Sequence, residues 1–413
     1  MSSLFQLECP SCRHAHGDGT TIFCDDCFTP LEVAYDLPRV REEMTRSVIE
    51  SRPLDIWRYR ELLPVPADAQ TELPVGFTPL LAAPSLGRQL GSQHLLLKND
   101  SACFPTLSFK DRVVAVALAA ARSFGFTVVG CASTGNLANA VAAQAARLGL
   151  EAWILVPRDL EPAKLLATAV YGAKLVRVEG NYDQVNRLCA EIAERHRWGF
   201  VNVNLRAYYA EGSKTVAFEI AEQLGWRLPD NVVVPMAGGA QISRIAKGFR
   251  ELVALGLVAD HPVRLFGAQA AGCSPIAAAA QQGRSEIVPE QPRTLCHSLA
   301  IGDPADGYRA LRVMRDSGGS AESATDDEII QGMRLLAETE GIFGETAAGV
   351  TVAGAAKLLA QGRIAPQQTT VLCVTGNGLK TTDALAGRLS LGPTVRPRIA
   401  EFEALLEEQA VAV

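Results

Sequence analysis

The sequence lacks the features of membrane, secreted and nucleic-acid-binding proteins. No stretch of the 413 residues approaches the roughly 20 consecutive apolar residues that cross a bilayer. The N-terminal segment has no basic region followed by an apolar one, so a secretory signal is not expected. The net charge is −6 and the basic residues are scattered, which makes nucleic acid a poor partner. These absences favour a cytoplasmic protein that binds neither membrane nor nucleic acid.

The sequence also lacks the two common nucleotide-binding motifs. It contains no Walker motif and no G-x-G-x-x-G fingerprint followed by an acidic residue. It does contain a small-residue loop, Pro-Met-Ala-Gly-Gly-Ala-Gln at 235–241, between an expected strand and an expected helix. Small residues there allow backbone N–H groups to face a phosphate at the helix N-terminus. A tight turn would use the same residues, so the loop alone leaves both interpretations open.

The ten cysteines do not form the pattern of a disulfide framework. Four of them lie in apolar or helical contexts and are interpreted as inert core residues: Cys131, Cys189, Cys273 and Cys373. Another four form C-x2-C-x11-C-x2-C, namely Cys9, Cys12, Cys24 and Cys27. This spacing predicts a structural Zn²⁺ held by four thiolates. A ribbon without metal, or one with a redox disulfide, is the alternative.

From about residue 94 onward, expected strands alternate with expected helices. The strands are expected at 94–98, 127–132, 152–156, 174–178, 199–202, 231–235, 263–268 and 369–375. The helices are expected at 109–124, 137–148, 162–171, 182–197, 211–224, 241–255, 326–340, 346–361 and 379–386. Residues 282–322 are expected to form long loops. This alternation predicts an α/β fold with parallel strands and right-handed crossovers.

Three polar loops follow expected strands, and one lysine accompanies them. Lys110 begins a small, apolar, helix-forming run, and the turn 133–136 (Ser-Thr-Gly-Asn) follows the strand 127–132. Thr375 ends the last strand, where ligands sit in open α/β sheets. A charged helix start and ordinary caps would explain each feature separately. Together they predict one site in which a lysine holds an aldehyde cofactor as a Schiff base beside a carboxylate-binding turn, which indicates pyridoxal phosphate.

Six segments of the sequence form a recognisable set. They are 105–112 (Pro-Thr-Leu-Ser-Phe-Lys-Asp-Arg), 132–136 (Ala-Ser-Thr-Gly-Asn), 208–215 (Tyr-Tyr-Ala-Glu-Gly-Ser-Lys-Thr), 298–302 (Ser-Leu-Ala-Ile-Gly), 340–346 (Glu-Gly-Ile-Phe-Gly-Glu-Thr) and 375–380 (Thr-Gly-Asn-Gly-Leu-Lys). With these segments the chain resembles the ribbon-bearing group of the threonine synthases, within the tryptophan-synthase-β-like (fold type II) pyridoxal phosphate enzymes. The similarity extends from about residue 7 to about residue 390.

The resemblance implies a fold of two open, mostly parallel sheet domains behind an N-terminal zinc ribbon. The ribbon is expected at 1–36. A large cofactor-binding domain is expected to combine 37–120 with 205–413, and a smaller mobile α/β domain to span 121–204. The resemblance also implies a homodimer.

The resemblance further assigns roles to particular residues. Lys110 would bind the cofactor covalently and then act as the base at Cα and Cβ. Asn136 would hydrogen-bond the phenolic oxygen of the cofactor, and Thr375 would face its pyridine nitrogen. The cofactor phosphate would lie on Ala237, Gly238, Gly239, Ala240 and Gln241. Ser133 and Thr134 would hold the substrate carboxylate, with Arg206 and Lys214 as candidates for the substrate phosphate.

The implied activity is a pyridoxal-phosphate-dependent lyase reaction. Phosphate is eliminated from Cγ of O-phosphohomoserine, and water adds at Cβ to give L-threonine. Departures from the family pattern on the substrate side, such as Asp303, leave open a relative that eliminates or replaces a group on another activated amino acid. A catalytically inactive binding protein whose ribbon contacts a partner is the alternative from another class.

Overall fold

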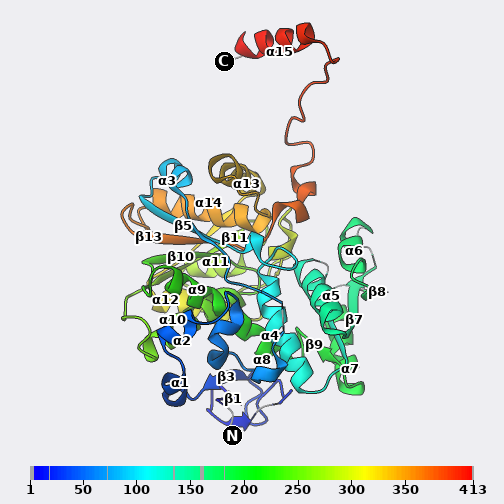
Figure 1. The fold of residues 1–413 in the computed structure, drawn as a ribbon, viewed down its shortest axis with the longest axis vertical. Helices are drawn as coiled ribbons and strands as arrows, with labels where there is room; N and C mark the ends of the chain where they lie inside the picture. The colour runs from blue at the N-terminus through cyan, green and yellow to red at the C-terminus, as the bar shows by residue number, and fades with distance from the viewer. Residues whose placement is uncertain are drawn as a thin grey trace.

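The computed structural model describes residues 4–17, 19–71, 73–133, 135–158, 162–180 and 182–411. Three sheets organise these residues (Figure 1). The N-terminal sheet is antiparallel, in the order β2-β1-β3, from β1 (Phe5–Glu8), β2 (Ala15–Gly17) and β3 (Glu32–Tyr35). It carries the four clustered cysteines at one end of the molecule.

The largest sheet has six strands in the order β12-β11-β10-β13-β5-β4. Its strands are β4 (Leu80–Ala82), β5 (His94–Asn99), β10 (Asn231–Pro235), β11 (Arg264–Ala270), β12 (Ala321–Ala324) and β13 (Thr369–Val374). All neighbours are parallel except β4 and β5. Helices α3 (Pro84–Leu90), α13 (Asp326–Glu340) and α14 (Thr346–Ala360) cover one face, and α10 (Ala240–Ala254), α11 (Pro275–Gln281) and α12 (Gly307–Asp316) cover the other.

The second parallel sheet has the order β8-β7-β6-β9, with β6 (Val128–Ala132), β7 (Glu151–Pro157), β8 (Lys174–Val178) and β9 (Gly199–Phe200). Successive side chains of a strand point to opposite faces. Val129 and Cys131 therefore join the core under α5 (Asn136–Leu148), whereas Ala132 packs with residues of α7 (Tyr182–Arg195). Helix α6 (Pro162–Ala169) packs beside α5 and β8.

Helix α4 (Lys110–Ser123) lies between the two parallel sheets (Figure 1). Every residue from 111 to 121 is buried. A helix that is apolar on all sides must be covered on all sides, and the run of valines and alanines in α4 meets that condition. It packs against α5 and against the short helix α8 (Arg206–Gly212), so the position of Lys110 is fixed by both halves of the molecule.

Most predicted elements are present within two residues of their expected bounds, and the mixed α/β fold with parallel sheets is confirmed. Three expectations were wrong. The helix expected at 211–224 is two helices, α8 and α9 (Thr215–Gln223). The helix expected at 379–386 is two short 3-10 turns, Gly378–Lys380 and Thr382–Leu385. The expected loop 282–322 contains α12 and the start of β12. The sequence did not indicate α12, because only three of its apolar residues (Ala310, Leu311 and Met314) are buried and glycines and prolines surround the segment.

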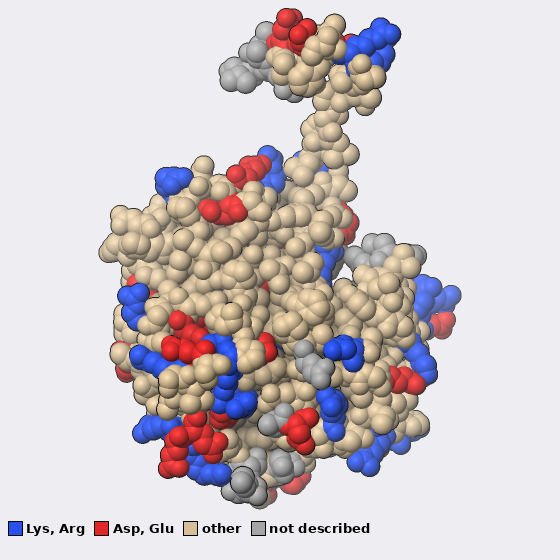
Figure 2. Space-filling view, in the orientation of Figure 1, with Lys and Arg blue, Asp and Glu red and all other residues tan. Residues whose placement is uncertain are grey.

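The ends of the chain lie far apart (Figure 1). The first helices after the ribbon, α1 (Leu37–Glu43) and α2 (Arg46–Glu50), stay close to it. The last helix, α15 (Ile399–Val411), stands away from the body on an extended segment. Within the described residues, no helix has the length and apolar content to span a membrane. Figure 2 shows basic and acidic side chains interspersed over the face seen in Figure 1.

Candidate active site

Lys110 is the first residue of α4, and its amine is half-buried. The Nζ atom lies 2.8 Å from the hydroxyl oxygen of Tyr209 and 5.5 Å from the centroid of the same ring. The ring of Phe109 lies 5.7 Å away. The amine therefore has one polar partner and lies beside two aromatic rings.

The loop before Lys110 is held in place by hydrogen bonds to Asp111 and to Thr375. The buried carboxylate of Asp111 accepts bonds from the N–H and the hydroxyl of Thr106, at 3.0 and 2.8 Å. Phe109 donates its N–H to the carbonyl of Thr375 at 2.8 Å. Leu107 has a φ of 60°, a left-handed conformation that favours glycine. Burial raises the pKa of Asp111 to about 6, although the bonds from Thr106 oppose that rise.

A buried group of charges anchors the first turn of α4. Arg112 is fully buried and pairs with Asp100 at 2.7 Å and with Glu219. Lys98 also pairs with Glu219, at 2.6 Å. Burial alone raises the pKa of Glu219, but the Arg112 and Lys98 charges lower it to about 2, so the carboxylate stays ionised. These ion pairs tie α4 to β5 and α9 directly behind the site.

Asn136 and Thr375 meet at the carboxylate of Glu345. Asn136 begins α5, and its side-chain amide donates to Oε2 of Glu345 at 2.8 Å. The Thr375 hydroxyl, just after β13, donates to Oε1 at 3.0 Å. Glu345 is buried at the N-cap of α14, and this burial raises the pKa of its carboxyl group. One carboxylate therefore joins the end of the four-stranded sheet to the end of the six-stranded sheet.

Lys380 contributes a second cation to the same place. Its ammonium donates to the Asn136 side-chain oxygen at 3.0 Å. Burial lowers the pKa of Lys380, while the charges of Asp111 and Glu345 oppose that change. The two lysines, Lys110 and Lys380, thus both act electrostatically on Glu345.

The small-residue loop lies beside the end of β13. Strands β10 and β13 are neighbours in register, with Val233 opposite Leu372, so the residues that follow them emerge at the same sheet edge. Ala237, Gly238 and Gly239 form the loop, and Ala240 and Gln241 begin α10. Gly239 has a φ of 88°, and a Cβ there would meet the Asp306 carbonyl at 2.9 Å. No side chain caps the N-terminus of α10, which leaves its N–H groups to face an anion.

Of the two cations predicted for a substrate phosphate, Arg206 is near this loop. It pairs with Asp306 at 2.8 Å, and the Asp306 N–H donates to the carbonyl of Gly238 at 3.0 Å. Lys214, the second candidate, lies away from this loop. Its ammonium is fully buried, pairs with Glu211 and Glu251 at 2.8 Å each, and lies 3.8 Å from the centre of the Tyr35 ring. A buried ammonium with two carboxylates as partners is not available to a substrate.

The turn after β6 is only partly described. Ser133 follows the strand, and its hydroxyl accepts the N–H of Gly135 at 3.3 Å. Thr134 lies outside the described residues. The turn leads directly into Asn136, so Ser133 stands at the same edge as the contacts of Glu345.

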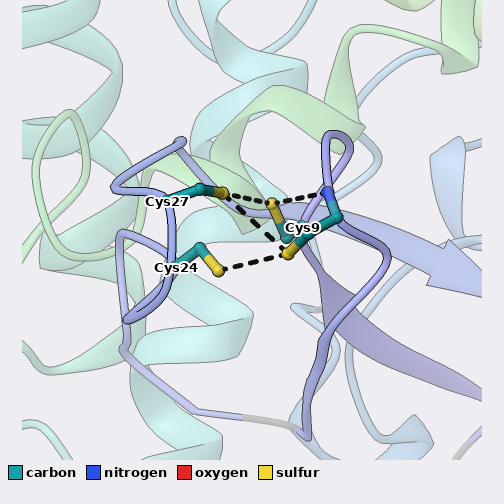
Figure 3. A group of neighbouring side chains, drawn as sticks. Cys9, Cys24 and Cys27 are labelled. Atoms are coloured by element: carbon teal, nitrogen blue, oxygen red, sulfur yellow. Dashed lines mark hydrogen bonds between the residues drawn. The ribbon is translucent and has the colours of Figure 1, made fainter.

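The four clustered cysteines form a compact group that could hold a metal ion. Their sulfur atoms all lie within 4.8 Å of one another. Figure 3 shows the sulfurs of Cys9, Cys24 and Cys27 turned toward one another. Desolvation raises the pKa of Cys9, but hydrogen bonds from the Cys12 N–H and from Cys27 lower it to about 6. Four thiols so close together ionise fully only with a cation between them, which fits the tetrahedral set that zinc prefers.

Three residues of the site were not predicted from the sequence: Tyr209, Glu345 and Lys380. Glu345 precedes a helix, where an acidic residue is normally interpreted as a favourable partner of the helix dipole. Tyr209 and Lys380 stand in the quoted segments, but nothing local distinguishes them from structural residues. Their positions depend on contacts between segments that are far apart in the chain.

The described residues fit pyridoxal phosphate. They offer a lysine amine with a phenol partner, an amide and a hydroxyl that converge, and an uncapped helix N-terminus behind a glycine loop. A Cβ at Gly238 would meet nothing within 4 Å, so the loop has open space on that side. At this edge the lysine amine matches the aldehyde of the cofactor, the amide and the hydroxyl match its ring substituents, and the helix N-terminus matches its phosphate.

Comparison with known proteins agrees with this chemistry. The family model described as "Pyridoxal-phosphate dependent enzyme" matches residues 71–376. The threonine synthase of Methanocaldococcus jannaschii is 37% identical over 379 residues, which cover 91% of this chain and 93% of that protein. The threonine synthase of Mycobacterium tuberculosis is 36% identical over 355 residues, covering 84% and 94%.

Solved structures show the same fold at low sequence identity. Diaminopropionate ammonia lyase from Escherichia coli superposes with a TM-score of 0.65 at 19% identity, over 83% of this chain and 91% of that one. Maize serine racemase gives 0.62 at 20% identity, over 88% and 100%. At this identity the likeness concerns the fold alone.

Proposed function

The chain belongs to the threonine synthase family of pyridoxal-phosphate dependent enzymes, and we propose that this lyase converts O-phosphohomoserine and water into L-threonine and phosphate. The observation that carries the proposal is the convergence of Lys110, Asn136, Thr375 and the glycine loop where the two parallel sheets meet. The threonine synthases that match over most of their own length support the same reaction.

Each residue of the candidate site would have its own role in this reaction. Bound pyridoxal phosphate supplies an electron sink for negative charge that develops next to the amino group. Lys110 would hold it and carry protons on Nζ between Cα and Cβ of the substrate. Asn136 and Thr375 would orient the ring, and residues 237–241 would hold its phosphate with backbone N–H groups. Glu345 would fix the Asn136 and Thr375 side chains through its two oxygens.

The substrate would lie between the end of β6 and α8. Ser133 and Thr134 would hold its carboxylate. Arg206 is the cation for its phosphate, because its partly exposed guanidinium has donors beyond the one that pairs with Asp306. Asp306 would keep that guanidinium pointed toward the glycine loop, since its backbone is bonded to Gly238.

The deciding experiment is turnover of O-phosphohomoserine by the cofactor-loaded protein, with phosphate and threonine measured together. We expect equal amounts of both products, because the same lysine serves elimination and water addition. Phosphate without threonine, or no turnover by a cofactor-loaded protein, would instead support a relative that acts on another activated amino acid. Absence of cofactor binding would support the inactive binding protein.

We also propose that Cys9, Cys12, Cys24 and Cys27 bind one structural Zn²⁺. Metal analysis of the purified protein is expected to give about one zinc per chain, and Cys24→Ser is expected to reduce it strongly. Cys273→Ser is the matched control, because that buried thiol lies outside the cluster. A metal-free protein with four titratable thiols, or a disulfide in the cluster, would contradict the proposal.

The proposed assembly is a cytoplasmic homodimer in which each chain has three units. The unit 1–36 contains β1–β3, the unit 121–204 contains the four-stranded sheet, and 37–120 with 205–413 contain the six-stranded sheet. None of the ten cysteines, all of which the structure describes, is in a disulfide, which suits a reducing compartment. Closure of the smaller unit would exclude water until the substrate has lost its phosphate.

A further inference from the structure

Helix α8 connects the cysteine ribbon to the amine of Lys110. On one side, the buried Tyr208 donates its hydroxyl to the Gly19 carbonyl at 2.7 Å and accepts the Gly19 N–H at 3.1 Å. Gly19 lies between the two cysteine pairs of the ribbon. Glu211, one turn further on, accepts the hydroxyl of Tyr35 from β3 at 3.0 Å.

The other side of the same helix faces the site. Tyr209 is bonded to Lys110, as described above, at 2.8 Å. Arg206, three residues earlier, lies on the same side because residues spaced by three are neighbours on a helix. It reaches Asp306 and through it the glycine loop. Seven residues therefore carry the contacts of both the ribbon and the active site.

Helix α8 owes its position to these contacts. A helix of seven residues has little stability of its own, so tertiary partners determine where it lies. On the α4 side, a Cβ at Gly212 would meet the Cα of Val113 at 2.6 Å, so the two helices are in close contact there. On the ribbon side, Lys247 joins the carbonyl of Val33 in β3 to Glu211, at 2.6 and 2.7 Å. A displacement of the ribbon therefore acts on Tyr209.

We propose that the four-cysteine ribbon is a positioning element of the active site, which acts through Tyr208 and α8 to hold Tyr209 as the hydrogen-bond partner of the Lys110 amine. This inference rests on the proposed role of Lys110. A phenol hydroxyl can accept a hydrogen bond from a protonated Nζ and can donate one to a neutral Nζ, so it can stay bonded to this atom in both protonation states. Tyr209 touches the reacting nitrogen, whereas Tyr208 is a positioning residue that never reaches it.

The test is a pH titration of the visible absorbance of the cofactor-loaded protein, whose midpoint reports protonation at the Lys110 nitrogen. Tyr209→Phe is expected to lower this midpoint by about one pH unit or more, because the protonated form loses a charge-assisted hydrogen bond, which is stronger than the bond that the neutral form loses. Tyr208→Phe is expected to lower it by a smaller, measurable amount. Tyr308→Phe is the control, because that tyrosine lies on α12 and is 65% exposed, and it should leave the midpoint unchanged.

The double variant Tyr208→Phe/Tyr209→Phe shows whether the ribbon acts through Tyr209. If it does, the effect of Tyr208→Phe disappears once the Tyr209 hydroxyl is gone. An unchanged midpoint in Tyr208→Phe, or a shift that persists in the double variant, would overturn the inference while leaving the proposed function intact. A wild-type protein without a cofactor band would overturn the proposed function, and this inference with it.

Discussion

Lys110→Ala is expected to abolish the visible absorbance of the bound cofactor and to lower kcat by about 1000-fold or more, within the range for losing a positioned acid–base group. In the proposed function this one amine both attaches the cofactor and moves protons at two carbons, whereas Lys380, the other amine at this edge, is bonded to Asn136. Absorbance spectra and single-substrate kinetics on the purified variant measure both effects.

Two further variants separate the chemistry of Lys110 from its charge. Lys110→Arg keeps a cation beside Tyr209, but a guanidinium is not a useful nucleophile, so the band should disappear here too. Lys174→Ala removes a half-exposed lysine paired with Glu151 on the four-stranded sheet and should change neither spectrum nor rate. Retention of the band in Lys110→Ala would refute the assignment of this lysine.

Arg112→Met is expected to lower the free energy of unfolding by about 3–5 kcal/mol, the usual result of removing one partner from a buried ion pair. The change leaves Asp100 and Glu219 buried with Lys98 as their remaining cation. Denaturant titration followed by far-UV circular dichroism measures the effect. Activity should fall as well, because the buried pairs fix the first turn of α4, where Lys110 lies.

Arg312→Met is the matched control for this substitution. Arg312 is 73% exposed and lies 3.5 Å from Asp316 on the surface, where ion pairs contribute little. Its free energy of unfolding should change by no more than about 0.5 kcal/mol. If Arg112→Met and Arg312→Met lowered the free energy of unfolding equally, the buried ion pairs would contribute no more to stability than the exposed one.

The pH dependence gives an independent check on the same cluster. In the wild type the pKa of Glu219 is lowered to about 2, so its contribution to stability is complete above 4.5 and is lost as the pH falls below that value. In Arg112→Met the largest of the charges that lower this pKa is gone, so the pKa lies closer to its unfolded value and the variant loses less stability in acid. The difference in unfolding free energy between the wild type and Arg112→Met should therefore become smaller below pH 4.5. A difference that stays constant there would contradict this account of Glu219.

The sequence predicted the fold well because its signals are local. Strands such as β10 and β13 are short apolar runs, and helices such as α10 and α14 have a proline- or glycine-marked beginning or end nearby. The break between α8 and α9 falls at Gly212, but a single glycine is also tolerated inside a helix, so it does not by itself indicate a break. The break follows from the close contact of Gly212 with α4, which no single segment contains.

The candidate site was predicted only in part, because only some of its residues have a local signal in the sequence. Lys110, Asn136 and Thr375 stand at the ends of expected elements, and the structure brings these three places together. Lys214 looked equally suitable in the sequence, yet its amine is enclosed by Glu211 and Glu251. The roles assigned to these residues stay predictions, whereas their positions are now described.

By itself, the sequence determined the order and type of most elements, the polar loops at the strand ends and the spacing of the cysteines. These features are local, since hydrophobic periodicity, turn residues and short motifs act over a few neighbouring residues. Only the tertiary structure decided which side chains meet: Asn136 with Glu345, 209 positions apart, Lys110 with Tyr209, and the ribbon with α8. Such pairings depend on how packed layers place distant segments, and no local pattern encodes the identity of a partner across that distance.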